Sequence, residues 1–264
     1  ADLENLMNEA AILTARDGRQ VIADVDIEEA VDRVLAGPAR RSRLIGPREK
    51  EITAYHEAGH ALVAHSLQSV DAVHKITVVP RGISGGHTRL LSIGDRQLWT
   101  RTQLMDNLAF ILGGMAAEDL VLGETTTGPG SDLEQATDTA RRMVSAFGMS
   151  EVIGPVVLGR FEGYGNHTRE ASDRQISDLT AAQVDQEVRR IINDALARAR
   201  TVLEERRPIL DRVAQTLMHQ ETLQGESLLR MLDGQEPTAD GQDDKTSGKP
   251  DPRSTPGPRQ SEAA

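Results

Sequence analysis

Apolar residues recur at helical spacing along most of the chain, and this pattern predicts a mainly α protein. In residues 48–67, for example, Ile52, Tyr55, Leu62 and Val63 are available to bury a helix. Turn-forming Gly and Pro residues separate several of the periodic stretches. Helices are expected over residues 2–16, 26–35, 48–67, 102–122, 133–147, 177–219 (two helices, continuing past Pro208) and 226–232.

Two segments have the character of strands instead. Residues 74–79 are rich in β-branched side chains and end at Pro80, and residues 86–91 follow a Gly85-Gly86 turn. The two segments are expected to pair as a small ribbon. The predicted fold class is therefore mainly α, a helical domain with a small β ribbon.

Local signals mark three helix boundaries. Asp26 can cap the second helix, and either Ser131 or Asp132 can cap the helix that begins near residue 133. The pair Gly113-Gly114 lies inside a helical pattern, which indicates either a break or a close crossing with another helix.

Composition limits the kinds of ligand and metal site that the chain can have. The net charge of −11 argues against nucleic acid as the main ligand, because the phosphate backbone would be repelled. The chain has no Cys, so a metal would have to be held by His, Asp or Glu. It also lacks the run of about 18 apolar residues that a membrane-spanning helix needs, so the chain as given is expected to be soluble.

The strongest chemical signal is the sequence HEAGH at residues 56–60. On a helix, His56 and His60 project from one face, one turn apart, where two imidazoles can bind one zinc ion. Glu57 lies beside that face, where a carboxylate can act as a general base. This layout is typical of zinc peptidases.

A zinc ion held by two His needs at least one more protein ligand. The residue types allow His74, His87, Glu118, Asp119 or Asp132. Each also has an ordinary structural interpretation, such as a solvated helix end for the Glu118-Asp119 pair or an N-cap for Asp132. Spacing alone leaves the choice open.

The sequence resembles the FtsH-type ATP-dependent zinc metalloproteases, which are membrane-anchored AAA+ proteases. The resemblance covers residues 1 to about 234, and its motifs are TAYHEAGHAL at 53–62, VHKITVVPRG at 73–82, ILGGMAAEDLVLGE at 111–124, TTTGPGSDLEQATDTARRMV at 125–144 and EVRRII at 187–192. It implies that His56, His60 and Asp132 bind one Zn²⁺ per chain and that Glu57 is the general base. It also favours the second strand as the one that holds substrate, with His74 and His87 in structural or surface roles.

The resemblance further implies a division of the chain. Residues 1–44 correspond to a remnant of the AAA+ lid helices and a linker, 45–234 to the zinc peptidase domain, and 235–264 to a disordered tail. No GxxxxGK[ST] phosphate loop occurs, so ATP is expected to bind only in an ATPase module absent from this sequence.

The function expected from these residues is a zinc endopeptidase that degrades unfolded or membrane proteins. By resemblance, the full-length protein is a homo-hexamer in the cell membrane, with its peptidase domain on the cytoplasmic side and its membrane segment outside this chain. Two alternatives are a non-catalytic scaffold or assembly ring that retains the fold and a purely structural metal site. The intact Glu57 argues against both, because neither needs a base.

Overall fold

The computed structural model describes residues 2–39, 46–82, 85–91, 94, 98–158 and 176–235. Most of the predicted linker and nearly all of the predicted tail lie outside these residues. Over the described residues the elements are α1 (Asp2–Arg16), α2 (Asp24–Ala36), α3 (Pro47–Ser66), β1 (Ala72–Thr77), β2 (His87–Leu91), α4 (Arg101–Ile111), α5 (Gly113–Leu122), α6 (Gly130–Ser145), α7 (Asp178–Glu205), α8 (Arg207–Gln220), β3 (Thr222–Gln224) and α9 (Gly225–Leu232). The predicted fold class, mainly α with a small β component, is confirmed.

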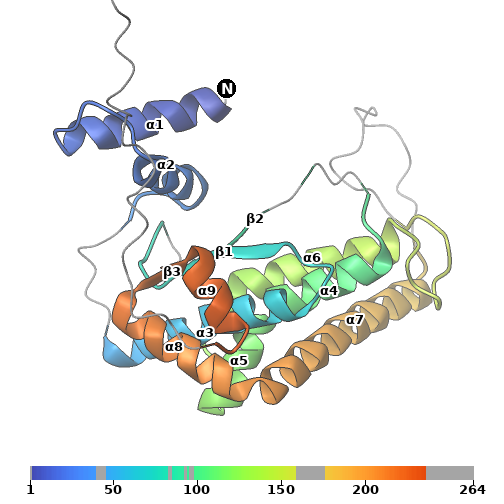
Figure 1. Cartoon of the computed structure of the whole chain (residues 1–264). Coiled ribbons are helices and arrows are strands. Elements are labelled where there is room, and N and C mark those ends of the chain that lie inside the picture. Colours follow the sequence, from blue (N-terminus) through green and yellow to red (C-terminus); the bar gives the residue numbers. More distant parts are fainter. Residues whose placement is uncertain are drawn as a thin grey trace, which may run out of the picture.

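The helix α3 lies at the centre of the molecule, packed against α5, α8 and β1 (Figure 1). Half of its residues are buried, including Ala58, Leu62 and Val63. Because apolar residues surround α3 on several sides, the helix is buried more completely than a surface helix with one apolar stripe. Its polar residues in the interior, Glu57 and His60, must therefore have partners there.

Two apolar clusters make up the core of the described chain outside α1 and α2. One surrounds α3 and takes residues from β1, α8 and α9, while the other joins α4, α6 and α7. Figure 1 shows α4, α6 and α7 running alongside one another. Aromatic residues are only 2% of the chain, so Ala, Leu, Ile and Val supply most of the buried surface.

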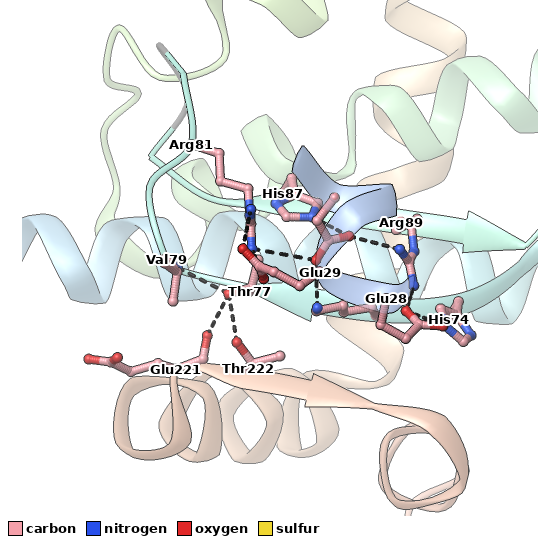
Figure 2. A network of polar contacts seen from close by, with 12 residues as sticks. Glu28, Glu29, His74, Thr77, Val79, Arg81, His87, Arg89, Glu221 and Thr222 are labelled. Atoms are coloured by element: carbon pink, nitrogen blue, oxygen red, sulfur yellow. Dashed lines mark hydrogen bonds and ion pairs between the residues drawn. The ribbon is translucent and has the colours of Figure 1, made fainter. Parts of the chain in front are cut away.

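The sheet has three antiparallel strands in the order β2-β1-β3. The predicted ribbon of two strands is present, although β1 begins and ends two residues earlier than expected. The short third strand was not predicted. It is joined to β1 at Thr77, whose hydroxyl donates to the Glu221 carbonyl at 2.9 Å and lies 2.8 Å from the Thr222 hydroxyl (Figure 2).

Two predicted helix caps are wrong. The helix α6 begins at Gly130, so Asp132 lies within its first turn rather than at its cap, and Ser131 is also helical. Likewise α2 begins at Asp24, two residues before the predicted cap. Asp26 still satisfies a helix terminus, because its carboxylate accepts a hydrogen bond from the Ala23 amide at 2.9 Å.

The helices α3 and α5 approach so closely that only glycine fits at their crossing. A Cβ on Gly59 would lie 2.5 Å from the Gly113 carbonyl oxygen and 2.6 Å from the Ala117 Cβ. The Gly113-Gly114 pair predicts either a helix break or a close crossing, and the structure has both, since α4 ends at Ile111 and α5 begins at Gly113.

Replacing Gly59 with alanine is expected to destabilise the fold. Glycine to alanine inside a helix ordinarily stabilises by about 1 kcal/mol, but here the added methyl group forces α3 and α5 apart, at a cost of about 1–3 kcal/mol. Urea unfolding measures the change. Gly130→Ala is the control, because its Cβ would have no atom within 4 Å; equal stability of both variants would rule out the packing explanation.

The helices α1 and α2 form a separate small unit around Ala10, Leu13 and Ala30. In Figure 1 this pair lies to one side of the other helices. Side-chain ion pairs link α2 to both strands of the β1–β2 ribbon and to Arg81, which follows β1 (Figure 2). None of the helices in the described part of the chain is both long and apolar enough to cross a membrane.

Candidate metal centre

Three side chains from two helices converge on one point. His56 and His60 lie one turn apart on α3, and their Nε2 atoms are 3.0 Å apart. The first turn of α6 brings Asp132 to them, with its Oδ2 atom 3.1 Å from His56 Nε2 and 3.6 Å from His60 Nε2. Among the described residues, His56, His60 and Asp132 form a group whose donor atoms lie close enough together to hold one metal ion.

The distances among the three donors fit zinc. Bonds of about 2.0–2.2 Å at tetrahedral angles place neighbouring donor atoms about 3.3–3.6 Å apart. The observed separations of 3.0, 3.1 and 3.6 Å are close to that range. Two imidazoles and one carboxylate are also ligand types that zinc accepts, and three protein ligands leave a fourth position for substrate.

The other ring nitrogens fix the orientation of both imidazoles. His60 Nδ1 lies 2.8 Å from the Phe110 carbonyl oxygen, which can only accept, so Nδ1 carries a proton, and in a neutral ring with this tautomer the lone pair is on Nε2. His56 Nδ1 lies 2.8 Å from Glu118 Oε1. Each histidine therefore directs Nε2 to the site, as metal-binding histidines with an outer hydrogen-bond partner do.

The charges around the site favour a cation. Burial alone would lower the pKa of His56, but hydrogen bonds with Asp132 and Glu118 outweigh it and raise the pKa to about 10. Burial would raise the pKa of Asp132, but contacts with His56 and His60 hold that pKa well below its usual range. The site thus holds a proton when no metal is bound, and a metal must displace it.

Gly114 gives the His56 ring its space. A Cβ at this position would lie 2.5 Å from Cε1 and 2.6 Å from both ring nitrogens of His56. The two consecutive glycines of α5 therefore have separate roles. Gly113 allows α3 to pack closely against α5, and Gly114 leaves room for the His56 imidazole. Sequence reasoning anticipated only the first role.

Glu57 lies beside the three donors in the same cavity, which has a volume of about 870 Å³. Glu57 is 5% exposed, and its carboxylate accepts a hydrogen bond from the Thr88 hydroxyl, 2.7 Å from Oε2. Glu57 and all three donors line this one cavity, so a ligand bound in it can contact both. Thr88 was not found from the sequence, because a single threonine in a strand carries no chemical signal.

The remaining candidate ligands lie elsewhere or have other partners. His74 lies 3.3 Å from Glu28, and His87 Nε2 lies 3.6 Å from Asp32 Oδ1, both on the side of the ribbon that faces α2. Asp119 pairs with Arg200 at 2.8 Å on the surface. Among the three donor residues, Glu118 contacts only His56, and it does so at Nδ1, on the far side of the ring from the donor cluster. Glu118 is therefore placed to support His56 and not to bind the metal itself.

Replacing Glu118 with glutamine is expected to weaken zinc binding by about 10- to 100-fold, because loss of an outer carboxylate reduces the basicity and the order of the ligand it supports. Competition with a chromophoric chelator measures the affinity. Asp119→Asn, a change at the adjacent surface carboxylate, serves as the control and is expected to bind zinc normally. Unchanged affinity in Glu118→Gln would show that His56 needs no such support.

Comparison with known proteins gives a consistent result. Residues 43–231 match peptidase family M41. The chain is 48% identical over 238 residues to ATP-dependent zinc metalloprotease FtsH 1 of Sphaerobacter thermophilus, covering 90% of this chain and 36% of that protein. It is 45% identical over 235 residues to FtsH of Bacillus subtilis (88% and 37% covered) and 46% identical over 234 residues to FtsH of Thermus thermophilus (89% and 37% covered). The chain thus spans little more than a third of the length of these relatives.

Proposed function

Because the chain belongs to peptidase family M41, we propose that it is the peptidase portion of a zinc-dependent endopeptidase that hydrolyses unfolded polypeptides. The observation that carries the proposal is the convergence of His56, His60 and Asp132 on one point, with Glu57 lining the same cavity. His56, His60 and Asp132 are the proposed ligands of one zinc ion, and Glu57 is the proposed general base.

The chemistry divides between the metal and the chain. Zinc at this site would supply a Lewis acid for the scissile carbonyl and for the attacking water. Glu57 accepts the proton that this water loses as its oxygen forms a bond to the carbonyl carbon. Glu57 then returns the proton to the nitrogen of the leaving amine as the C–N bond breaks. The carboxylate ends the cycle ionised, as it began.

The edge strand β2 is the proposed site for the substrate backbone. It is the outer strand of the sheet, and residues 85–88, at and just before its start, line the cavity. An extended peptide can add to such an edge by main-chain hydrogen bonds, which select for extended conformation more than for side chains. This mode of binding suits a protease that degrades many unfolded sequences.

The names of the relatives couple proteolysis to ATP, and we extend that coupling to a full-length protein containing this chain. In the extended proposal, residues 1–44 belong to the helical lid of an AAA+ module, and the apolar side chains of Leu3, Ile12 and Leu35, which are exposed here, pack against that module. The full-length protein would be a membrane-anchored homo-hexamer with this region on the cytoplasmic side. No described feature favours the alternative of a non-catalytic scaffold.

Cleavage of casein by the zinc-loaded chain tests the proposed function. We expect internal cuts, identified by mass spectrometry of the products, and loss of cleavage when 1,10-phenanthroline removes the metal. Cleavage that continues unchanged in the chelator would refute a zinc mechanism. A zinc-loaded chain that leaves casein and other unfolded substrates intact would favour the scaffold.

A further inference from the structure

The strand β2 faces two different parts of the molecule. Side chains alternate along a strand, so His87 and Arg89 point to one side and Thr88 to the other. On the first side, Arg89 Nη1 lies 2.8 Å from Asp32 Oδ1 of α2. On the second side, the Thr88 hydroxyl donates to Glu57 Oε2 of α3 at 2.7 Å. One strand therefore joins the N-terminal helices to the proposed general base.

The contact between α2 and the ribbon is ionic and buried. Asp32 is 1% exposed, and its carboxylate lies between Lys75 Nζ, 2.5 Å away on β1, and Arg89 on β2. Lys75 and Arg89 are directly opposite each other in the strand register, so a single carboxylate binds both strands. A buried charge with matched partners is costly to separate, which makes this contact specific.

Further ion pairs surround Asp32. Glu28 pairs with Arg89 and His74, and Glu29 pairs with Arg81 at 2.6 Å (Figure 2). Burial alone would raise the pKa of Asp32, but His87, Lys75 and Arg89 outweigh it and hold the pKa well below its usual range. Asp32 is therefore charged at neutral pH, and α2 presents Asp32 and Glu28 to the two strands and Glu29 to Arg81, which follows β1.

Glu57 is held closely by the segment that includes the start of β2. The Thr88 hydroxyl contacts Oε2, and Gly86 lies so near the other oxygen that a Cβ there would be 2.9 Å from Glu57 Oε1. A glutamate has three rotatable side-chain bonds, so its carboxylate can take several orientations beside the cavity that it lines. The hydrogen bond from Thr88 favours the one in which Oε2 faces the hydroxyl.

We propose that Thr88 is a positioning residue for Glu57, and that Asp32 holds Thr88 in place through Arg89, so that docking of α2 on the ribbon sets the orientation of the general base. This inference rests on the proposed function. It assigns a role to the N-terminal helices, which belong neither to the ligand cluster nor to the residues that match the family. When α2 is displaced, β2 is released, and Glu57 then loses its orienting contact. Because a shift of about 1 Å in a reacting group can cost about 100-fold in rate, a small movement of β2 is sufficient.

Substitutions at Thr88 test the first part. Thr88→Val keeps the shape and removes the hydroxyl, and we expect kcat for fluorescein-labelled casein to fall about 10- to 100-fold with little change in KM. Thr88→Ser keeps the hydroxyl and is expected to retain most of kcat. Both variants should carry zinc as the wild type does, which separates loss of orientation from loss of metal. Wild-type kcat in Thr88→Val, or equal losses in both variants, would overturn the assignment.

Substitutions at the α2 contact test the second part. Arg89→Gln removes the shorter of the two contacts between Asp32 and β2, the other being His87 at 3.6 Å, and it leaves Asp32 its partner Lys75, so the fold keeps a neutralised carboxylate. We expect kcat to fall several-fold in Arg89→Gln, with no further loss when the change is made in Thr88→Val. Glu29→Gln is the control, because it breaks an ion pair between α2 and Arg81, outside β2, and it should leave kcat unchanged.

The outcomes separate this inference from the proposed function. Three results would each overturn the connection through β2. They are wild-type kcat in Arg89→Gln, an equal loss of kcat from Arg89→Gln whether or not the Thr88 hydroxyl is present, and the same loss of kcat in Glu29→Gln. A wild-type chain that carries zinc and cleaves nothing would instead remove the proposed function on which the inference rests.

Discussion

Replacing Glu57 with glutamine is expected to lower the rate of casein cleavage by roughly 10²- to 10⁴-fold, the usual contribution of a general base. Glutamine has nearly the shape of glutamate, and its amide can still accept the hydrogen bond from Thr88 at 2.7 Å. It cannot take a proton from water at neutral pH. The fold and the ligand cluster should persist, so zinc content per chain should match that of the wild type.

The control for Glu57→Gln is a carboxylate on the same helix. Glu51 also belongs to α3 but is absent from the residues that line the cavity, so Glu51→Gln should retain wild-type cleavage. Initial rates with fluorescein-labelled casein, together with elemental analysis of zinc, measure both variants. Persistent cleavage in Glu57→Gln at full zinc content would show that another group accepts the proton.

The second large effect is expected at Asp132. Asp132→Asn replaces an anionic ligand with a neutral amide that binds zinc weakly, and it removes the carboxylate within 3.6 Å of both imidazoles. The loss in zinc affinity should exceed the roughly 10- to 100-fold loss expected for an outer partner. Zinc content after dialysis should fall towards zero, and casein cleavage should fall with it.

A matched change on the same helix controls for Asp132→Asn. Asp138 is exposed and lies on α6, far enough along the helix to be outside the cluster. Asp138→Asn should bind zinc with wild-type affinity. If Asp132→Asn also retained one zinc per chain at wild-type affinity, the third ligand would have to be a different residue.

The sequence was sufficient to predict the helix at the centre of the fold. The helix at 48–67 matches α3 (Pro47–Ser66) to within a residue, although α3 is buried on several sides and has no single apolar stripe. The strand β3 was missed because a segment of three residues is too short to show a pattern. The caps at Asp26 and Ser131 or Asp132 failed because several polar residues stand together there and only the folded chain selects one.

The site could be predicted in part for similar reasons. Two ligand candidates and the candidate base are fixed by local spacing on one helix, so His56, Glu57 and His60 follow from the residues themselves. The third candidate comes from another helix, and pattern alone could not separate Asp132 from Glu118. Family resemblance favoured Asp132, and the geometry supports that choice because Glu118 reaches only the far side of the His56 ring, at 2.8 Å.

The link from α2 to Glu57 could not have been predicted from sequence reasoning. Asp32, Arg89 and Thr88 lie in three ordinary contexts: a charged helix face, a polar strand position and a strand hydroxyl. Their importance depends on the strand register that places Lys75 opposite Arg89 and on the packing of β2 beside α3. Long-range contacts of this kind appear only when the fold is known.

Casein cleavage measured as a function of bound zinc tests the central claim most directly. Zinc is added back in steps to the metal-free chain, and cleavage rate and metal content are determined on the same samples. The proposed site predicts that the rate rises in proportion to bound zinc and reaches its plateau at one zinc per chain. Cleavage at full rate by the metal-free chain, or no cleavage once one zinc is bound, would contradict it.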